Sequence, residues 1–535
     1  MTKRSSSNET EPKKPRLDVE EAAEEDSVEK VPKREKRRQR LMESPTGELT
    51  VTLTPKWAEL LKKETTTDRA KELSQEIHSV VETHYVEVGR TKRGSRIVQS
   101  VIKFGDNEIR QTIISELTGH FVDFCRKSCT RHIISRLIQH CNKTLIAPLL
   151  VEVLPESTTL IKNLEGARIL QDLFNSMKYL KKQLTLVVLG KDVLSICELE
   201  QLDPLKTSLK DILEKRPLRK EEILKRSIDN MAIILSKGIG MLTLVQTAFW
   251  SLVSCCSPSV IRASVVPLVK DHFIELLESS FGRKVLIQCI RCGTARDRRT
   301  FVKKVKGKAA EIACTEEVYI VILALIACTD DTSLVNKHIL SEILPHVETM
   351  FTSKYGSTVL KFLVAGRAAK SISPPILESF SVIEIDEELS SKKDEDIRCK
   401  EVQQIVAEPI LTCIQTNFLT YLAHPIAQYV ILEAVSHLEA DLLKETLPEL
   451  LKEFDIEKIT SSLLIRPVKR LFRTGVAEVV STITNIVLTA DLTPFVDNVD
   501  VGFFLQAIVD FVKDADEKLC LKLRKRIKKQ GINLN

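Results

Sequence analysis

Three short segments carry polar side chains that could contact nucleic-acid bases, and they recur at a fixed distance along the chain. They begin at Ser95, Arg131 and Ala167, so consecutive copies are 36 residues apart. Residues four positions apart share one face of a helix, which brings Ser95 and Gln99 together beside Arg96 in the first copy. An amide can pair with the edge of a base, and a guanidinium plane can stack on one. Each segment is therefore predicted to present two edge-contacting groups and one stacking group.

The second and third copies keep only part of this set. The second offers Arg131, His132 and Ser135, and the third offers Arg168 and Gln171. An arginine on such a face could instead bridge adjacent repeats, and both interpretations stay open.

A run of cations forms a second group of candidates. Seven of thirteen positions are basic and only Asp297 is acidic, the basic residues being Arg296, Arg298, Arg299, Lys303, Lys304, Lys306 and Lys308. Helical spacing places Arg296, Arg299 and Lys303 on one side. Lysine and arginine bind phosphates without regard to sequence, and Arg283 and Lys284 add to this set. The alternative is a solvated face that balances acids elsewhere.

Helices must position these side chains. Further copies of the segment begin at Leu242, Arg283, Val318 and Ser357, in steps of 41, 35 and 39 residues, with weaker copies around residues 425–431 and 466–471. Recurrent helical units of this length predict an all-α solenoid. Apolar residues stand at several edge positions, namely Leu242, Val318 and Ile322. At most one or two copies could therefore specify a base, and we expect binding dominated by phosphate contacts.

Composition narrows the class of protein. The 535 residues are 43% hydrophobic and 5% aromatic, which favours helices, and 79 basic against 73 acidic residues leave a net charge of +6. Thirteen cysteines without a framework predict free, mostly buried thiols in a reduced, intracellular protein. The apolar run 319–328 is half the length that a bilayer needs and predicts a buried helix rather than a membrane span.

Motifs for catalysis or cofactor binding are missing from the sequence. There is no phosphate-cradling glycine loop, no zinc-protease helix and no Cys/His nucleophile arrangement. Cys289 and Cys292 have zinc-knuckle spacing but no second ligand pair, and the acids Asp330 and Asp331 are better suited to cap a helix. We expect a protein that is not an enzyme and holds no metal or cofactor.

Four regions follow from these patterns. Residues 1–50 form a charged tail, predicted to be disordered, whose basic clusters at 13–16 and 33–40 suggest nuclear targeting. Residues 51–370 hold the first array of repeats, 371–402 a partly acidic connecting loop, and 403–535 the last repeats.

Two stretches resemble the core of a Pumilio (PUF) repeat, namely Arg93–Gln99 and Lys354–Lys361. Residues 292–299, 328–335 and the segment from His424 are similar to the divergent Puf-A-like branch, whose chains end in a CPL region. The resemblance implies an L-shaped α-solenoid and a nucleolar protein of ribosome biogenesis that binds nucleic acid with little sequence preference. By the code of that family, Ser95 and Gln99 would favour adenine with Arg96 stacking.

The expected partners follow from the same resemblance. They are RNA, pre-rRNA above all, with mRNA or DNA as further options, and pre-ribosomal proteins; the chain is expected to be monomeric, nuclear and nucleolar, and away from membranes. Two alternatives stay open. A helical scaffold of HEAT or armadillo type could bind a protein or peptide, although those units run to about 40–47 residues. A sequence-specific repressor of mRNA translation would keep the fold but read bases.

Overall fold

The computed structural model describes residues 46–381, 383 and 393–532, and within these ranges every regular element is a helix. The predicted all-α fold is therefore confirmed. The basic clusters at 13–16 and 33–40 lie outside the described residues, as does the centre of the predicted acidic loop. The chain divides into two compact units, residues 1–109 and 110–535.

In the first unit the described helices are α2 (Gly47–Leu60), α3 (Thr67–Val81), α4 (Tyr85–Gly89) and α5 (Lys92–Phe104). Helix α6 (Asn107–Leu117) runs across the boundary. In the second unit the described α-helices are α7 (Phe121–Arg126), α8 (Arg131–His140), α9 (Ala147–Val153), α10 (Ser157–Leu160), α11 (Leu164–Ser176), α12 (Lys181–Leu189), α13 (Lys191–Leu199), α14 (Leu209–Lys215), α15 (Lys220–Ser236), α16 (Thr243–Val253), α17 (Pro258–Val260), α18 (Val266–Leu277), α19 (Ser280–Cys292), α20 (Ala295–Lys304), α21 (Ala309–Cys314), α22 (Tyr319–Cys328), α23 (Thr332–Val335), α24 (Ser341–Ile343), α25 (Val347–Thr352), α26 (Gly356–Ala365), α27 (Pro374–Glu378), α28 (Glu395–Ala423), α29 (Gln428–His437), α30 (Ala440–Leu451), α31 (Ile456–Thr460), α32 (Ile465–Phe472), α33 (Ala477–Thr489), α34 (Val499–Ala515) and α35 (Glu517–Lys529).

Short 3₁₀ and π segments join some of these helices. They are η1 (Lys178–Leu180), η2 (Pro217–Arg219), η3 (Ile261–Val265), η4 (Asn336–Leu340), η5 (Leu344–His346), η6 (Gly366–Ala368) and η7 (Thr493–Phe495).

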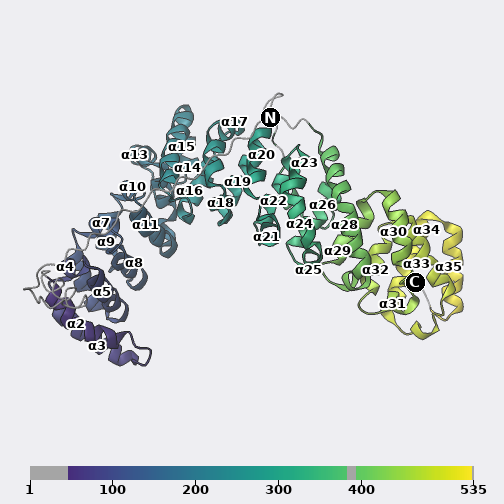
Figure 1. Ribbon diagram of the computed structural model, residues 1–535, viewed down its shortest axis with the longest axis horizontal. Helices are drawn as coiled ribbons and strands as arrows, with labels where there is room; N and C mark the ends of the chain where they lie inside the picture. Colours follow the sequence, from purple (N-terminus) through teal and green to yellow (C-terminus); the bar gives the residue numbers. More distant parts are fainter. Residues whose placement is uncertain (1–45, 382, 384–392, 533–535) are drawn as a thin grey trace, which may run out of the picture. The chain divides into compact units, whose positions relative to one another are not determined.

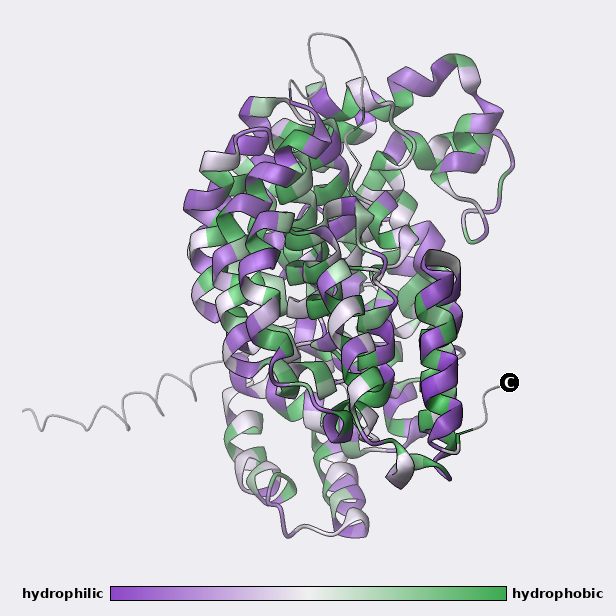
Figure 2. Cartoon of the chain, turned by 90° about the vertical axis from the view of Figure 1, so that its right-hand side faces the viewer, coloured by the Kyte–Doolittle hydropathy of each residue, from purple (hydrophilic) through white to green (hydrophobic). Residues whose placement is uncertain are grey.

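Each predicted copy of the repeated segment lies on a helix. In the second unit these helices contact one another in the order of the chain, namely α8, α11, α16, α19, α22, α26, α29 and α32 (Figure 1). We call them the slot helices. Polar and apolar residues alternate along the helical ribbons, as amphipathic helices require (Figure 2). The inward positions are apolar and sealed: Ile97 and Val98 in α5, like Ile133 and Ile134 in α8, have no exposed surface.

A glycine at the start of a slot helix allows the preceding helix to come close. A Cβ on Gly282 would lie 2.2 Å from the carbonyl oxygen of Leu276, six residues earlier, and one on Gly166 would lie 2.6 Å from that of Leu160. Real Cβ atoms do not approach so closely, and overpacking of this kind destabilises a fold. The recurrent glycine is thus a packing requirement of the repeat.

The apolar run 319–328 forms α22, and the prediction of a buried helix is confirmed. Nine of its ten residues are buried, Ile320 being the exception. No helix in the described parts of the chain is long and apolar enough to cross a membrane. None of the thirteen cysteines, all within the described residues, forms a disulfide bond; six are buried and seven are partly exposed, so fewer are buried than the sequence suggested.

The predicted connecting loop is partly helical and is fastened to the repeats. Arg291 donates from Nε to the carbonyl oxygen of Ser381 at 2.6 Å, and the Cys328 thiol donates to that of Phe380 at 3.0 Å. On the other side of the loop, α28 starts at Glu395 and continues to Ala423, across the predicted boundary at residue 402.

Candidate nucleic-acid interface

The first position of the repeated segment is buried in three of the copies. Ser95 is 1% exposed, and the equivalent residues Ala167 and Ser357 have no exposed surface. Ser135, at the second edge position of its copy, is 8% exposed. The prediction that Ser95 and Ser135 offer their hydroxyls to a base is wrong, because neighbouring helices cover these positions.

Hydrogen bonds within the protein occupy the edge groups. Gln99 donates from Nε2 to the Ser95 hydroxyl at 3.0 Å, and Ser135 donates to Asp172 Oδ2 at 2.5 Å. Gln171 accepts the backbone N–H of Leu244 at 2.8 Å and donates to Asn175 at 2.9 Å. A group that must break such a bond to pair with a base gains little net energy from doing so.

The middle position of the segment stays accessible, and it carries nitrogen-rich side chains. Arg96 and His132 are exposed, and the Arg168 side chain is 42% exposed. Although His132 is exposed, partial desolvation of its ring and then the neighbouring Arg131 cation lower its pKa, so the ring is neutral at pH 7 and can stack but adds no charge.

A single carboxylate organises the cations of α8 and α11. Glu165 forms ion pairs with Arg131 and with Arg168, the second at 3.2 Å. The side chains of Arg131 and Glu165 are only 18% and 17% exposed, so Arg131 bridges adjacent repeats. Of the two interpretations open for Arg131, the structure favours the bridge, whereas Arg168 keeps a more exposed guanidinium.

Arg283 and Lys284 also differ in exposure: the first is buried and paired within the protein, and the second is accessible. Arg283 is 9% exposed, donates to the Leu277 carbonyl oxygen at 2.8 Å and pairs with Glu317, so its prediction as a phosphate contact is corrected. Lys284 is exposed, and its Nζ lies 5.4 Å from the centre of the Phe281 ring and 5.7 Å from that of Trp250.

Helix α20 presents most of the predicted cationic run to solvent. Arg296, Lys303 and Lys304 are exposed, as are Lys306 and Lys308 after the helix. Arg299 is exposed too, although its guanidinium pairs with Asp331 at 3.0 Å. We call Arg296, Arg299, Lys303, Lys304, Lys306 and Lys308 the α20 basic surface.

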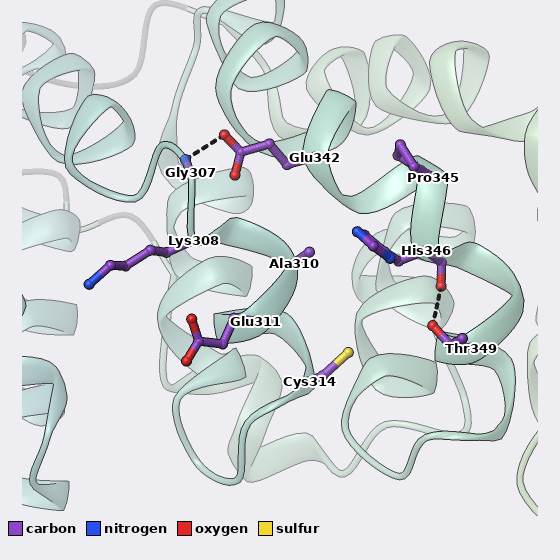
Figure 3. A pocket seen from close by; sticks show the side chains of 9 residues that line it. All are labelled: Gly307, Lys308, Ala310, Glu311, Cys314, Glu342, Pro345, His346 and Thr349. Carbon is purple, nitrogen blue, oxygen red and sulfur yellow. Dashed lines mark hydrogen bonds between the residues drawn. The ribbon is translucent and has the colours of Figure 1, made fainter.

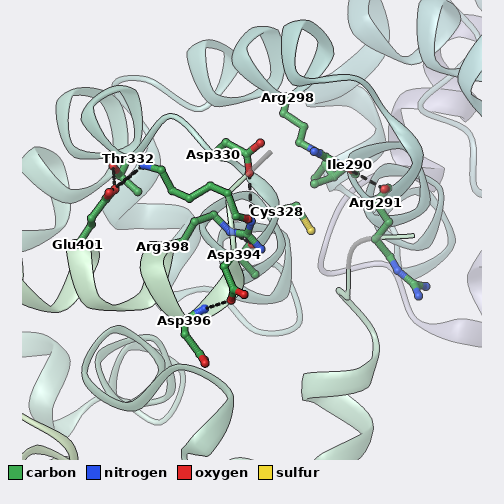
Figure 4. A network of polar contacts seen from close by, with 12 residues as sticks. Ile290, Arg291, Arg298, Cys328, Asp330, Thr332, Asp394, Asp396, Arg398 and Glu401 are labelled. Carbon is green, nitrogen blue, oxygen red and sulfur yellow. Dashed lines mark hydrogen bonds and ion pairs between the residues drawn. The ribbon is translucent and has the colours of Figure 1, made fainter. Parts of the chain in front are cut away.

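Arg298 does not belong to this surface. It is 2% exposed and donates from Nε to the Ile290 carbonyl oxygen at 3.0 Å and from Nη2 to that of Arg291 at 3.2 Å, at the end of α19 (Figure 4). The sequence already held the signal, because Arg298 shares a helix face with the buried Phe301 and Val302, three and four residues on. The prediction of Arg298 as a phosphate contact is therefore corrected.

A second buried arginine continues this network. Arg398 of α28 donates to the Ala327 carbonyl oxygen at 3.1 Å and pairs with Asp330 at 3.0 Å (Figure 4). Between the arginines lies Cys328, whose pKa burial raises to about 11, so its thiol stays protonated. Asp331 caps α23 by accepting the N–H of Leu334 at 3.0 Å, as the sequence predicted for the Asp330-Asp331 pair.

The one acid within the cationic run has a structural task. Asp297 forms a capping box with Thr294 at the start of α20 and pairs with Lys270 at 2.5 Å. Burial opposes its ionisation, but the hydrogen bonds from Lys270 and Thr294 outweigh burial and lower its pKa. The carboxylate is thus neutralised locally and subtracts little from the α20 basic surface.

A groove of about 680 Å³ lies where α21 meets α24 and η5, next to Lys308 (Figure 3). Of its two carboxylates, Glu311 and Glu342, the second accepts the N–H groups of Gly307 at 2.6 Å and Ala309 at 3.0 Å, which joins two repeats. Burial raises the pKa of Cys314 in the same groove. Across the described residues, no three His, Cys, Asp or Glu side chains are grouped to hold a metal ion.

One basic helix was not predicted from the sequence. The slot helix α32 exposes Arg466, Arg470 and the adjacent Arg473, with Lys469 partly exposed. Their spacing of three and four residues places them on one side of a helix, a signal that the weak match of this copy concealed.

The chain is similar in sequence and in fold to several known proteins. The CPL (NUC119) domain model matches residues 352–473, starting before the predicted boundary at 403. Pumilio homolog 3 of Rattus norvegicus is 24% identical over 397 residues, covering 73% of this chain and 60% of the relative. Human Puf-A in complex with DNA has a TM-score of 0.77 at 18% identity, covering 91% of this chain and 98% of that one. These comparisons agree with the resemblance found in the sequence: the chain is similar to Puf-A-like Pumilio proteins and contains a match to the CPL domain.

Similar proteins extend to fungi. Pumilio homology domain family member 6 of Schizosaccharomyces pombe is 21% identical over 484 residues, covering 86% of this chain and 74% of the relative. The aligned part spans about 60% of the length of the rat and human Pumilio homolog 3 proteins.

Proposed function

We propose that this chain binds RNA, and also DNA, with little preference for sequence and mainly through phosphate contacts. One observation carries the proposal: the middle positions of the repeated segments present the cations Arg96, Arg168 and Lys284 and the neutral ring of His132, while the edge positions are buried or bonded within the protein. Cations without accessible edge groups supply affinity but no discrimination between bases. Human Puf-A, which shares the fold, has been crystallised with DNA, which supports nucleic acid as the ligand class.

The role in the cell that we propose is nucleolar ribosome biogenesis, with pre-rRNA as the main ligand and pre-ribosomal proteins as neighbours. The chain acts there as a non-catalytic, monomeric binder. The support is the resemblance to the Puf-A-like branch together with the basic clusters at 13–16 and 33–40. A fluorescent fusion should enter the nucleolus, and removal of residues 1–50 should leave it in the cytoplasm; equal nucleolar signal from both forms would contradict the targeting role.

The central experiment tests the α20 basic surface. Replacing Arg296, Lys303 and Lys304 by alanine should weaken binding to all RNA sequences alike. Each phosphate contact on single-stranded nucleic acid contributes about 0.7 to the slope of log K against log salt, so three lost contacts should reduce the slope by about 2. Binding would be measured by fluorescence anisotropy at several salt concentrations.

A matched control changes the same net charge elsewhere. Lys215, Lys225 and Lys237, on or next to α14 and α15, are exposed, and their replacement by alanine should alter the slope far less. Equal effects of the two triple variants would show that only total charge matters. No binding of RNA by the wild type at low salt would refute the proposed function and favour the protein-binding scaffold.

The repressor alternative makes a different prediction. A sequence-specific Pumilio protein would select a defined motif from random RNA, because each repeat would discriminate one base. The buried Ser95 and the internally bonded Ser135 and Gln171 favour the opposite result, a selection without a motif of several bases.

A further inference from the structure

A pocket between two slot helices of the CPL region is lined by none of the site residues predicted from the sequence, although Tyr429 and Arg470 lie within the two weaker copies of the repeated segment. It has a volume of about 240 Å³ and is lined from α29 by Tyr429 and Glu433, from α32 by Arg470, from the residue after α32 by Arg473, and from the segment after η6 by Lys370 and Ser371. Three cationic side chains thus face one carboxylate. The volume is below the range of about 300–1,000 Å³ typical of pockets for drug-sized ligands, so the occupant must be small or a part of a larger chain.

The single carboxylate of the pocket is already satisfied. Glu433 accepts the backbone N–H of Ser371 at 2.7 Å and lies 3.3 Å from His437 Nδ1, and its side chain is 5% exposed. By contrast, Lys370 and Arg473 are exposed, and neither has an ion-pair partner in the parts of the chain that the structure describes. The pocket therefore offers an anion two unpaired cations.

Two further groups of the pocket suit a nucleotide: the Ser371 hydroxyl could contact its phosphate, and the Tyr429 ring could contact its base. The hydroxyl of Ser371 is buried and has no hydrogen-bond partner among the residues that the structure describes, so a ligand oxygen could satisfy it. The Arg470 guanidinium lies 5.3 Å from the centre of the Tyr429 ring and is held there by a 2.7 Å hydrogen bond to Gln428. Tyr429 is partly exposed, so a planar ligand ring can stack on the Tyr429 ring, which Arg470 already holds in place.

We propose that this pocket binds one nucleotide of a single-stranded nucleic acid, its phosphate between Lys370, Arg473 and the Ser371 hydroxyl and its base against Tyr429. The inference rests on the proposed function and adds to it a second contact region with a preference for single strands. A duplex keeps its bases stacked on one another, so only an unpaired base can reach the ring.

The test uses the full chain and pairs of variants. The double variant Lys370→Ala/Arg473→Ala removes two cations from the pocket. Its matched control, Lys400→Ala/Lys452→Ala, removes two exposed lysines of the same region that do not line it. For a single-stranded oligoribonucleotide, the pocket variant should lose at least tenfold in affinity at low salt, and the control should lose less than threefold.

The ring is tested separately from the charges. Tyr429→Ala should weaken single-stranded RNA about fivefold or more, the lower bound of stacking on one base, and should leave duplex RNA of equal length unchanged. Tyr429→Phe keeps the ring and should bind like the wild type. Tyr179→Ala is the control for loss of a tyrosine outside the pocket. The Tyr179 ring also has a cation beside it, since Lys143 Nζ lies 4.7 Å from the ring centre, but Tyr179 does not line the pocket.

The outcomes separate this inference from the proposed function. If the wild type binds RNA and the α20 variant weakens it, while the pocket and control doubles behave alike, the function stands and the pocket assignment is wrong. Equal losses for single-stranded and duplex RNA in Tyr429→Ala would also overturn the nucleotide site. Helical circular dichroism and urea unfolding of each variant show whether a loss reflects misfolding, in which case Tyr429→Leu replaces the alanine variant.

Discussion

Substitution of Arg298 can distinguish a role in stability from a role in RNA binding. Its neighbours Arg296 and Arg299 carry the same charge but are exposed, whereas Arg298 is buried. We expect Arg298→Ala to destabilise the protein and Arg296→Ala to leave stability unchanged. Arg298 is 2% exposed, and its guanidinium is hydrogen-bonded to two carbonyl oxygens at the end of α19. Arg296 is exposed at the start of α20.

The magnitude follows from the two bonds. A hydrogen bond to a charged group contributes about 1.5–3 kcal/mol, and a buried acceptor left without a donor costs about 1–3 kcal/mol. The alanine variant leaves the carbonyls of Ile290 and Arg291 without this donor and opens space beside Phe301 and Val302. Since the array need not unfold in one step, we expect the free energy of unfolding to fall by about 2–4 kcal/mol, and only in the cooperative unit that contains α19 and α20.

The assay is urea unfolding followed by circular dichroism, with hydrogen exchange of the α19 and α20 amides to locate the effect. Arg298→Lys keeps the charge but replaces the planar guanidinium, which donates from Nε and Nη2, by a single ammonium nitrogen, so it should also destabilise. For Arg296→Ala, the unfolding midpoint should stay constant and the affinity for RNA should fall. An Arg298→Ala protein with normal unfolding and weakened RNA binding would refute the reasoning, because it would place this side chain on the binding surface.

Two further predictions concern the slot helices. Gly282→Ala should cost about 1–3 kcal/mol of stability because its Cβ would lie 2.2 Å from the Leu276 carbonyl oxygen, whereas Gly502→Ala in α34, with no atom near its Cβ position, should be neutral or stabilising in the same urea assay. Glu165→Gln should strengthen RNA binding about two- to fivefold at low salt, since it releases Arg168 and removes a negative charge from the surface; anisotropy titrations showing weaker binding would mean that Glu165 is needed to position the arginines.

The repeat architecture was predictable because its cause is local. Apolar positions such as Ile97 and Val98 recur with helical spacing, and the glycine before them recurs because the preceding helix leaves no room for a Cβ. The apolar run from Tyr319 to Cys328 coincides with helix α22. Each of these features depends on contacts within one repeat or with its neighbour, and the sequence of the repeat records them.

The candidate site was less predictable because residue type does not reveal which face a neighbouring helix covers. Ser95 and Arg283 are polar and stand at positions that a single helix would expose, but adjacent helices bury both. Arg298 could have been excluded from spacing alone, since it lies on the face of Phe301 and Val302. The pocket around Tyr429 could not have been found from spacing, because Lys370 and Arg473 are about a hundred residues apart and only the packing of α29 against α32 and against the segment after η6 brings them together.

Buried edge groups and accessible cations have a joint consequence for specificity. Glu165 holds Arg131 and Arg168, and Gln428 holds Arg470, so polar residues of the slot helices position cations instead of contacting a ligand. A cation in a fixed position attracts every phosphate equally, and its removal subtracts the same free energy from each complex. Affinity and sequence preference should therefore be independent in this protein. Substitutions on the α20 basic surface should shift the affinities of all RNA sequences together, without changing their rank.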